Sequence, residues 1–137
     1  MPVRELTSDA VVSVDPSTPV PTIAERMLEE NVGCVVVTEQ SRPVGVVTDR
    51  ELALSLTDAF DATALDAGDL MDEDVAAVHA DDGIVDALRA MHRTTSRQAT
   101  VVDDTHRLVG VVTLDRVVST VSRELLETVR AVGTAPQ

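Results

Sequence analysis

The sequence predicts a protein of mixed α and β structure (α/β, or α+β) that is built from two similar halves. Apolar residues of the first half return 64 positions later, as Leu6 and Leu70, Val11 and Val75, Val14 and Val78, Val20 and Ile84, and Met27 and Met91. The motif Gly-Val-Val-Thr at 45–48 returns at 110–113, with one additional residue before it. Each half reads as strand, helix, strand, strand and helix. Because two long copies are too few for a solenoid, we expect one compact unit.

The first half begins with a predicted strand at Val11–Val14, and Pro16 keeps the chain after it extended. Thr18 is the expected N-cap of a helix that has Pro19 at its first position. Residues at helical spacing give that helix one apolar face, which consists of Val20, Ile23, Ala24, Met27 and Leu28. Gly33 is expected to end the helix.

Two Val-rich strands follow at Cys34–Thr38 and Val44–Val47, and the polar residues Glu39–Arg42 form the turn between them. Valine favours strands because its branched side chain packs well on a pleated surface. A second helix is predicted to start near Asp49 and to carry three apolar residues, Leu52, Leu56 and Phe60.

The second half repeats this plan with different residues. Asp82 takes the N-cap position, and the helix stripe that follows consists of Ile84, Ala87, Leu88 and Met91. The strand pair is predicted at Ala99–Val102 and Leu108–Val112, with a turn at Asp103–His106. The last helix, from about Leu114 to Val132, is longer than its counterpart and carries an apolar stripe of Val118, Val121, Leu125 and Val129.

The charge and composition argue against nucleic-acid binding. The 137 residues include 24 acidic and 11 basic side chains, and the net charge of −13 would repel a phosphate backbone. One Phe and no Trp or Tyr leave no aromatic platform on which bases could stack. All 11 basic residues are Arg, which excludes a Schiff-base lysine and a P-loop lysine. Such an acidic, lysine-free composition is typical of halophilic, salt-accumulating microbes; an acidic protein from a GC-rich genome is the alternative.

The sequence shows no signal for a membrane or for secretion. No apolar run approaches the roughly 20 residues of a membrane span, so no membrane partner is expected. The N-terminus lacks a basic region followed by an apolar stretch, which argues against a secretory signal. Cys34 is the single cysteine, so no intrachain disulfide can form. These features predict a cytoplasmic protein.

Two copies of a strand–helix–strand–strand–helix unit, each with Gly-Val-Val-Thr before its last helix, resemble a tandem pair of CBS domains (a Bateman module). The resemblance covers about 3–56 and 67–126, which implies a free-standing module without a catalytic domain. The expected organisation is a first CBS repeat at 3–60, a connector at 61–69, a second CBS repeat at 67–132 with an extended C-terminal helix, and a frayed tail at 133–137.

The resemblance implies two repeats, related by a pseudo-twofold axis, that pack through their sheets and leave two clefts. In this family the clefts commonly hold adenosyl ligands such as AMP, ADP, ATP or S-adenosylmethionine as regulatory ligands, and no cofactor is required. Helices like those around Leu52–Phe60 and Val118–Val129 commonly build a disc-like homodimer. An unidentified target protein is a second potential partner.

The family motif at the cleft is Gly, two apolar residues, Ser or Thr, two variable residues and Asp. The hydroxyl and the first helical N–H groups can bind a phosphate at the positive end of the helix dipole. The Asp can accept the ribose hydroxyls, while apolar strand residues enclose the adenine. Gly45 and Thr48 match this motif in the first half, and Gly110 and Thr113 match it in the second.

The last motif position departs from the family pattern in both halves. Glu51 stands in place of Asp in the first half, and Arg116, which cannot accept a hydrogen bond, stands there in the second. Asp115 lies one position earlier and would point about 100° away around the helix. The first cleft therefore keeps a ribose acceptor, whereas the second either lacks this ligand or favours a more anionic one.

Each motif residue also has a purely structural interpretation. Thr48 and Thr113 are ligand hydroxyls or helix N-caps, and the two roles are compatible. Glu51 is a ribose acceptor or a first-turn acid that the helix dipole favours. Arg50 and Arg116 bind phosphate or lie on the surface. The full set of residues expected to bind nucleotide is Ser13, Val14, Cys34, Val36, Gly45, Thr48, Arg50, Glu51, Ala77, Val78, Ala99, Gly110, Thr113 and Arg116.

No catalytic or metal site is expected. His79, His92 and His106 have no metal-ligand spacing, and the acidic runs 72–74 and 81–82 fall in turns. The predicted function is therefore a non-enzymatic regulatory module that senses an adenine nucleotide or another adenosyl ligand. One alternative is an interaction scaffold that dimerises around empty clefts. The other is a small hydrolase, for which the sequence shows no nucleophile and base.

Overall fold

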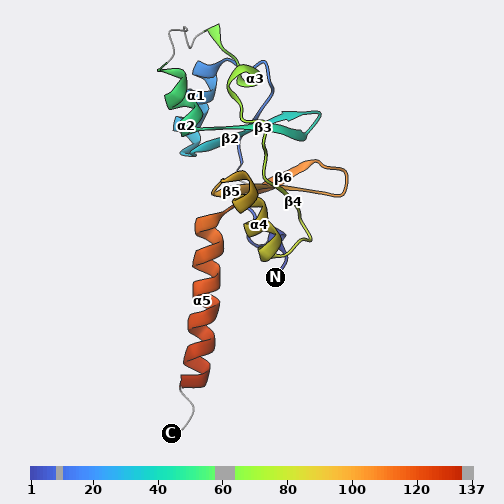
Figure 1. The fold of residues 1–137 in the computed structure, drawn as a ribbon, viewed down its shortest axis with the longest axis vertical. Coiled ribbons are helices and arrows are strands. Elements are labelled where there is room, and N and C mark those ends of the chain that lie inside the picture. The colour runs from blue at the N-terminus through green and yellow to red at the C-terminus, as the bar shows by residue number, and fades with distance from the viewer. Residues whose placement is uncertain (9–10, 58–63, 134–137) are drawn as a thin grey trace.

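The computed structural model describes residues 1–8, 11–57 and 64–133, and it contains two three-stranded sheets stacked on each other (Figure 1). The first sheet has the order β1 (Ser13–Val14), β2 (Cys34–Glu39), β3 (Arg42–Thr48). The second has the order β4 (Ala77–His79), β5 (Gln98–Val102), β6 (Leu108–Thr113). In each sheet the first two strands pair in parallel and the last two are antiparallel. The predicted fold class is confirmed.

Helical segments lie around both sheets. They are the 3-10 helix η1 (Val3–Glu5), α1 (Val20–Glu30), α2 (Asp49–Ser55), α3 (Ala67–Leu70), α4 (Ile84–Thr94) and α5 (Leu114–Gly133). The short segments η1 and α3 begin 64 residues apart, so they are equivalent parts of the two repeats. Neither was predicted from the sequence, because a single helical turn is too short to show an apolar period.

The predicted N-caps of α1 and α4 were wrong by one residue. The N-cap positions belong to Pro19 and Gly83, and neither contributes a side-chain cap. The carboxylate of Asp82, which was expected to cap α4, instead accepts the backbone N–H of His79 at 2.9 Å. Thr18, which was expected to cap α1, lies one residue outside the N-cap. The Thr18 hydroxyl donates to the carboxylate of Asp15 at 3.4 Å, so in both repeats the polar residue bonds within the turn before the helix rather than to the helix itself.

The end of α1 also differs from the prediction. Asn31, in the left-handed conformation with φ 53°, caps the helix in place of Gly33, since Asn tolerates this conformation better than most residues. Thr95 has the equivalent role and the same φ at the end of α4. Leu28 was expected on the buried face but is 83% exposed. The buried stripe is narrower than predicted, and it consists of Val20, Ile23 and Met27.

The observed strand pairs and the second helix agree more closely with the bounds predicted from the sequence. The turn between β2 and β3 narrows to Gln40 and Ser41, which both have positive φ. Helix α2 begins at Asp49 as predicted, but it ends before Leu56, whose side chain is 78% exposed. The predicted apolar position Phe60 lies outside the described residues.

Each sheet has its own core, and each core takes in a segment of chain that precedes the other repeat. Val35 and Val47 of the first sheet pack with Ala67, which opens α3. Val101 of the second sheet packs with Val3 and Leu6, which lie at the N-terminus. Val3 and Ala67 are both fully buried. The two repeats therefore exchange their leading segments, which ties them together through buried apolar contacts.

The backbone pairing of these leading segments shows the pseudo-twofold relation directly. Ser8 pairs with Val111 on β6, and its equivalent Asp72 pairs with Val46 on β3. The Ser8 bonds are 2.9 and 3.2 Å, and the Asp72 bonds are 2.8 and 3.0 Å. Each three-stranded sheet is thus extended at its β3 or β6 edge by a short stretch from the other repeat.

The hairpin turns of the two sheets also touch. The backbone N–H of Leu108 donates to the carbonyl of Ser41 at 2.8 Å. The Arg42 side chain donates to the carbonyl of Thr105 at 3.2 Å. These contacts join the two sheets at their hairpin ends, so the opposite strand ends are left to form the site described below.

Helix α5 continues away from the two sheets to the C-terminal end of the described chain (Figure 1). Val117, near its start, is its buried residue. Its apolar stripe is otherwise exposed, and the large hydrophobic residues on it are Val118, Val121, Leu125, Leu126, Val129 and Val132. No helix within the described residues is long and apolar enough to cross a membrane.

Candidate functional site

A cleft of about 1030 Å³ lies between the two sheets and is lined by both repeats. Alternation along the central strands decides which side chains face it. On β2, Cys34 and Val36 are on the cleft side, although Val36 is itself fully buried, whereas Val35 and Val37 belong to the first core. A strand presents every second residue to the same face, so the face of one residue fixes the faces of all the others on that strand.

The second repeat contributes the equivalent positions with polar side chains. Gln98 and Thr100 of β5 line the cleft, 64 positions after Cys34 and Val36. The Thr100 side chain is buried, and its hydroxyl donates to the carbonyl of Ala76 at 3.0 Å. The wall of the cleft is therefore more apolar on the first repeat and richer in hydrogen-bonding groups on the second.

Thr48 and Glu51 form a capping box at the start of α2, on the edge of the cleft. The Thr48 hydroxyl accepts the backbone N–H of Arg50 at 3.2 Å and donates to Oε2 of Glu51. The same Oε2 accepts the backbone N–H of Thr48 at 2.8 Å. The structural interpretation of both residues is thus correct, and both side chains still line the cleft.

Thr113 has a similar role before α5, where its hydroxyl accepts the backbone N–H of Arg116 at 3.1 Å. Thr113 lines the same cleft as Thr48, so both motif threonines face one continuous space. The neighbouring Asp115 carboxylate binds the guanidinium of Arg97 at 3.2 Å, and both side chains line the cleft.

The fourteen predicted site residues fall into two groups. Six line the cleft: Cys34, Val36, Thr48, Arg50, Glu51 and Thr113. Eight lie outside its lining: Ser13, Val14, Gly45, Ala77, Val78, Ala99, Gly110 and Arg116. Val14, Val78 and Ala99 face the repeat cores instead. Arg116 lines a separate hollow of about 370 Å³ near the N-terminus, together with Met1 and Arg123.

The sequence prediction missed several lining residues because of alternation. The cleft takes Gln98 and Thr100 where Ala99 was predicted. A one-residue slip along a strand moves a side chain to the opposite face. On the segment before β4 it takes Val75 and Ala76, whereas Ala77 and Val78 of the strand itself were predicted, so this miss is a shift along the chain rather than a change of face. The offset of 64 from Cys34 and Val36 was the signal in the sequence that could have found Gln98 and Thr100.

Burial raises the pKa of the Cys34 thiol from 9.0 to about 11, and the nearby carboxylates of Glu51 and Asp49 add to this effect. The thiol is therefore neutral near pH 7 and is a poor nucleophile. Its Sγ lies 3.6 Å from the carbonyl of Val35. Cys34 is thus suited to contact an apolar group in the cleft.

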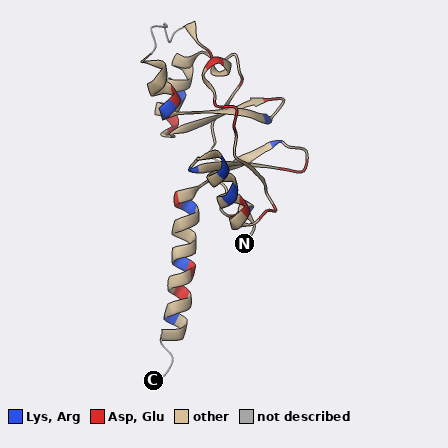
Figure 2. Ribbon diagram, in the orientation of Figure 1, with Lys and Arg blue, Asp and Glu red and all other residues tan. Residues whose placement is uncertain are grey.

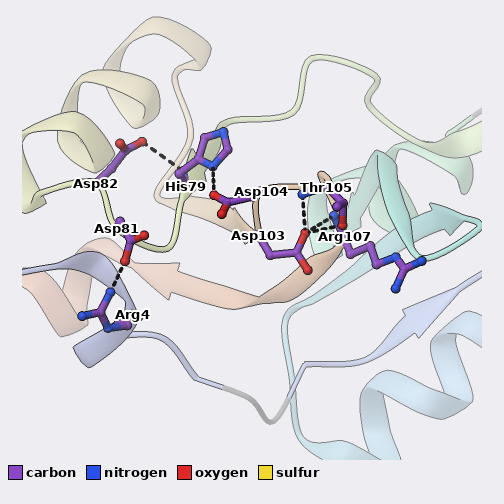
Figure 3. Close-up of polar contacts among 8 residues, drawn as sticks. All are labelled: Arg4, His79, Asp81, Asp82, Asp103, Asp104, Thr105 and Arg107. Carbon is purple, nitrogen blue, oxygen red and sulfur yellow. Dashed lines mark hydrogen bonds and ion pairs between the residues drawn. The ribbon is translucent and has the colours of Figure 1, made fainter.

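The acidic runs outside the cleft have structural contacts (Figure 3). Asp81 pairs with Arg4, and Asp103 accepts three hydrogen bonds within its own loop, two from Thr105 and one from Arg107. These bonds lower the pKa of Asp103. No group of three or more His, Cys, Asp or Glu residues in the described chain is placed to hold a metal ion.

The sequence model of the CBS domain matches residues 3–58 and 67–123 of this chain. The chain belongs to the CBS domain family. Among its relatives, the MK0525 protein of Methanopyrus kandleri is 30% identical over 82% of this chain, and the match spans 58% of that relative's length. This CBS chain is thus shorter than a protein to which it is clearly similar.

Solved structures of CBS proteins have the same fold. Hypoxic Response Protein I, solved with two coordinated zinc ions, superposes with a TM-score of 0.78 and 26% identity, over 87% of this chain and 98% of that one. The CBS domain protein PAE2072 of Pyrobaculum aerophilum, complexed with AMP, superposes with a TM-score of 0.77 and 24% identity, over 85% of this chain and 89% of that one.

Proposed function

We propose that this CBS chain is a non-enzymatic regulatory module that binds an adenine nucleotide or another adenosyl ligand between its two repeats. The observation that carries the proposal is the shared cleft, in which Thr48 and Thr113 cap helices on opposite sides of the pseudo-twofold axis. The AMP complex of the similarly folded PAE2072 supports this class of ligand.

Five of the six predicted residues that line the cleft are the proposed ligand contacts, because the sixth, Val36, is fully buried. Glu51 uses Oε2 for its capping bonds to Thr48, and we assign its Oε1 to the ribose hydroxyls. Thr48 and Arg50 lie where they can meet a group attached to the 5′ carbon of the ribose. Cys34 offers an apolar surface to the adenine ring, whose faces are apolar, and the fully buried Val36 lies on the same face of β2.

The two ends of the sheet interface suggest how binding is transmitted. At the hairpin end, Ser41 and Arg42 hold the two sheets together. At the cleft end, the sheets are separated by open space. A ligand that contacts both repeats favours one angle between the sheets, and it shifts the population toward that conformation to the extent that it binds it more tightly.

A scaffold that works through dimerisation is the second candidate, and the exposed stripe of α5 favours it. Residues 118–132 project beyond both cores, and an isolated helix of this length is marginally stable in water. We propose that a second copy of the chain packs on this stripe. Figure 2 shows charges of both signs along α5, so two such helices would not repel each other strongly.

A thermal-shift panel separates the sensor from the scaffold. The chain is heated at high salt with AMP, ADP, ATP, NAD and S-adenosylmethionine in turn. A ligand present at about 100 times its Kd stabilises the folded state by about 2.7 kcal/mol. Stabilisation by an adenosyl compound supports the sensor, and no stabilisation by any of them supports the scaffold.

Two variants place the binding site. Arg50→Ala changes a residue that lines the cleft, whereas Arg116→Ala removes the same kind of charge from the separate hollow. The shift should shrink in Arg50→Ala and persist in Arg116→Ala. The reverse result would place the ligand outside the cleft.

A further inference from the structure

The charges that line the cleft are mostly negative. Its lining includes five carboxylates and two guanidinium groups, which are Asp49, Glu51, Asp72, Asp74, Asp115, Arg50 and Arg97. This imbalance has the same sign as the net charge of the whole chain, −13. Clefts between walls of low dielectric focus such fields, so an incoming anion meets an unfavourable potential.

The two ends of the cleft differ in charge. At the first-repeat end, Asp49 and Glu51 belong to the first turn of α2. Asp72, whose backbone pairs with Val46 on β3, and Asp74, two residues later, line the cleft as well. Arg50 is the cation that α2 contributes to this end. The lining on the side of the first sheet therefore includes four carboxylates and one guanidinium.

The second-repeat end is close to neutral. Arg97 is paired with Asp115 at 3.2 Å, so its charge is already compensated. The other groups at this end that can contact a ligand are uncharged, and they include Gln98 and Thr113. Neither end thus offers a cluster of cations that could neutralise a chain of phosphates.

We infer that the cleft selects adenosyl ligands with a neutral or cationic 5′ substituent, such as a thioether or sulfonium group, over nucleoside polyphosphates. This inference rests on the proposed function and adds the substrate class to it. The carboxylates at the first-repeat end attract a cation and repel a phosphate chain. Since the same carboxylates act on both, the preference must weaken when salt screens their field.

Titration calorimetry on the whole chain tests the inference with 5′-methylthioadenosine, S-adenosylmethionine, AMP and ATP. In about 0.1 M KCl, ATP should bind at least about tenfold more weakly than 5′-methylthioadenosine, with AMP between them. In about 1 M KCl, where the screening length falls to about 3 Å, this gap should narrow.

Two variants with the same change of charge test the position of the effect. Asp74→Asn removes a carboxylate from the cleft lining, and Glu73→Gln removes the adjacent exposed carboxylate, which does not line the cleft. Asp74→Asn should strengthen ATP binding relative to 5′-methylthioadenosine by about threefold or more, and Glu73→Gln should change this ratio less.

The outcomes distinguish a failure of the proposed function from a failure of the charge selection. If none of the four compounds binds, the proposed function is wrong. If they bind but ATP binds as tightly as 5′-methylthioadenosine, or if the gap is unchanged by salt, the charge selection is wrong and the adenosyl site stands. An equal effect of Asp74→Asn and Glu73→Gln would also overturn the selection, because it would reflect net charge alone.

Discussion

Gly45 lies against Met71 so closely that a Cβ atom on residue 45 would stand 2.5 Å from the Met71 sulfur and 2.9 Å from the Met71 Cβ. Met71 follows α3, the segment that packs on the first sheet although it leads into the second repeat. The glycine of the motif is thus required where the exchanged segment crosses β3. This contact gives the motif glycine a structural role in addition to any role at a ligand.

Gly110→Ala should destabilise the fold more than Gly45→Ala. A Cβ on residue 110 would lie 2.3 Å from the backbone oxygen of Ser8, which cannot move without breaking its pairing with Val111. At Gly45 the two closest atoms are Sδ and Cγ of the flexible Met71 side chain, and only the 2.9 Å approach of the Met71 Cβ requires the backbone to shift. Overpacking of this kind costs about 1 to 3 kcal/mol, and urea denaturation at fixed salt measures it.

Gly133→Ala is the control for these two variants, because no atom lies within 4 Å of its Cβ position. It should not lower the free energy of unfolding. Equal stabilities of the wild type and Gly110→Ala would contradict the close approach of the leading segment to β6.

The melting temperature should rise substantially from low to molar KCl. The chain carries a net charge of −13, and this self-repulsion destabilises the compact state. The screening length falls from about 10 Å at 0.1 M to about 3 Å at 1 M ionic strength. Differential scanning calorimetry over a KCl series measures the effect. A melting temperature that is indifferent to salt would remove the argument for a halophilic origin, which stays a prediction.

Cys34 should react slowly with thiol reagents in the folded state. Its pKa is raised from 9.0 to about 11, so near pH 8 the thiolate is about a hundredfold scarcer than for an ordinary cysteine. The raised pKa also affects the pH dependence of stability. Because the thiol holds its proton more tightly in the folded state than in the unfolded state, the proton stabilises the fold fully below pH 9, and this stabilisation is lost as the pH rises through about 11. Alkylation as fast as that of the urea-unfolded chain would contradict this environment.

Leu125→Glu should abolish the proposed dimer and leave the fold intact. Leu125 lies on the exposed stripe of α5 and is 62% exposed, so the change is tolerated by a monomer but places a charge in a helix–helix interface. Analytical ultracentrifugation in high salt measures the mass. Leu28→Glu on α1 is the matched control, because Leu28 is exposed as well and lies on another helix. A wild-type monomer at micromolar concentration would contradict the dimer.

Glu51→Ala should weaken binding of an adenosyl ligand by about 1.5 to 3 kcal/mol, which is about a ten- to hundredfold loss of affinity. The change removes the proposed ribose acceptor and half of the capping box with Thr48. Glu51→Gln keeps a capping oxygen, so its stability should stay closer to that of the wild type. Titration calorimetry measures the affinity, and Arg116→Ala should bind as the wild type does. Unchanged affinity in Glu51→Ala would remove Glu51 from the site.

Elements with a strong local period could be predicted from the sequence. The strands β2 and β3, the start of α2 and the length of α5 agree with the prediction because their residues repeat at intervals of two or about 3.6. The 64-residue repeat also predicted that the chain consists of two similar halves with equivalent elements. The ends of α1 were less predictable, because the competition between Asn31 and Gly33 for the C-cap depends on local geometry.

The residues alone were enough to predict the two repeats, their longer strands and helices, and the motif threonines that line the cleft. The exchange of leading segments, which places Val3 in the core of the second repeat and Ala67 in that of the first, emerges at the level of tertiary packing. The same holds for the cleft, which both Asp72 and Glu51 line, and for Arg116, which lines another hollow. These outcomes depend on contacts between residues far apart in the chain, which no local period records.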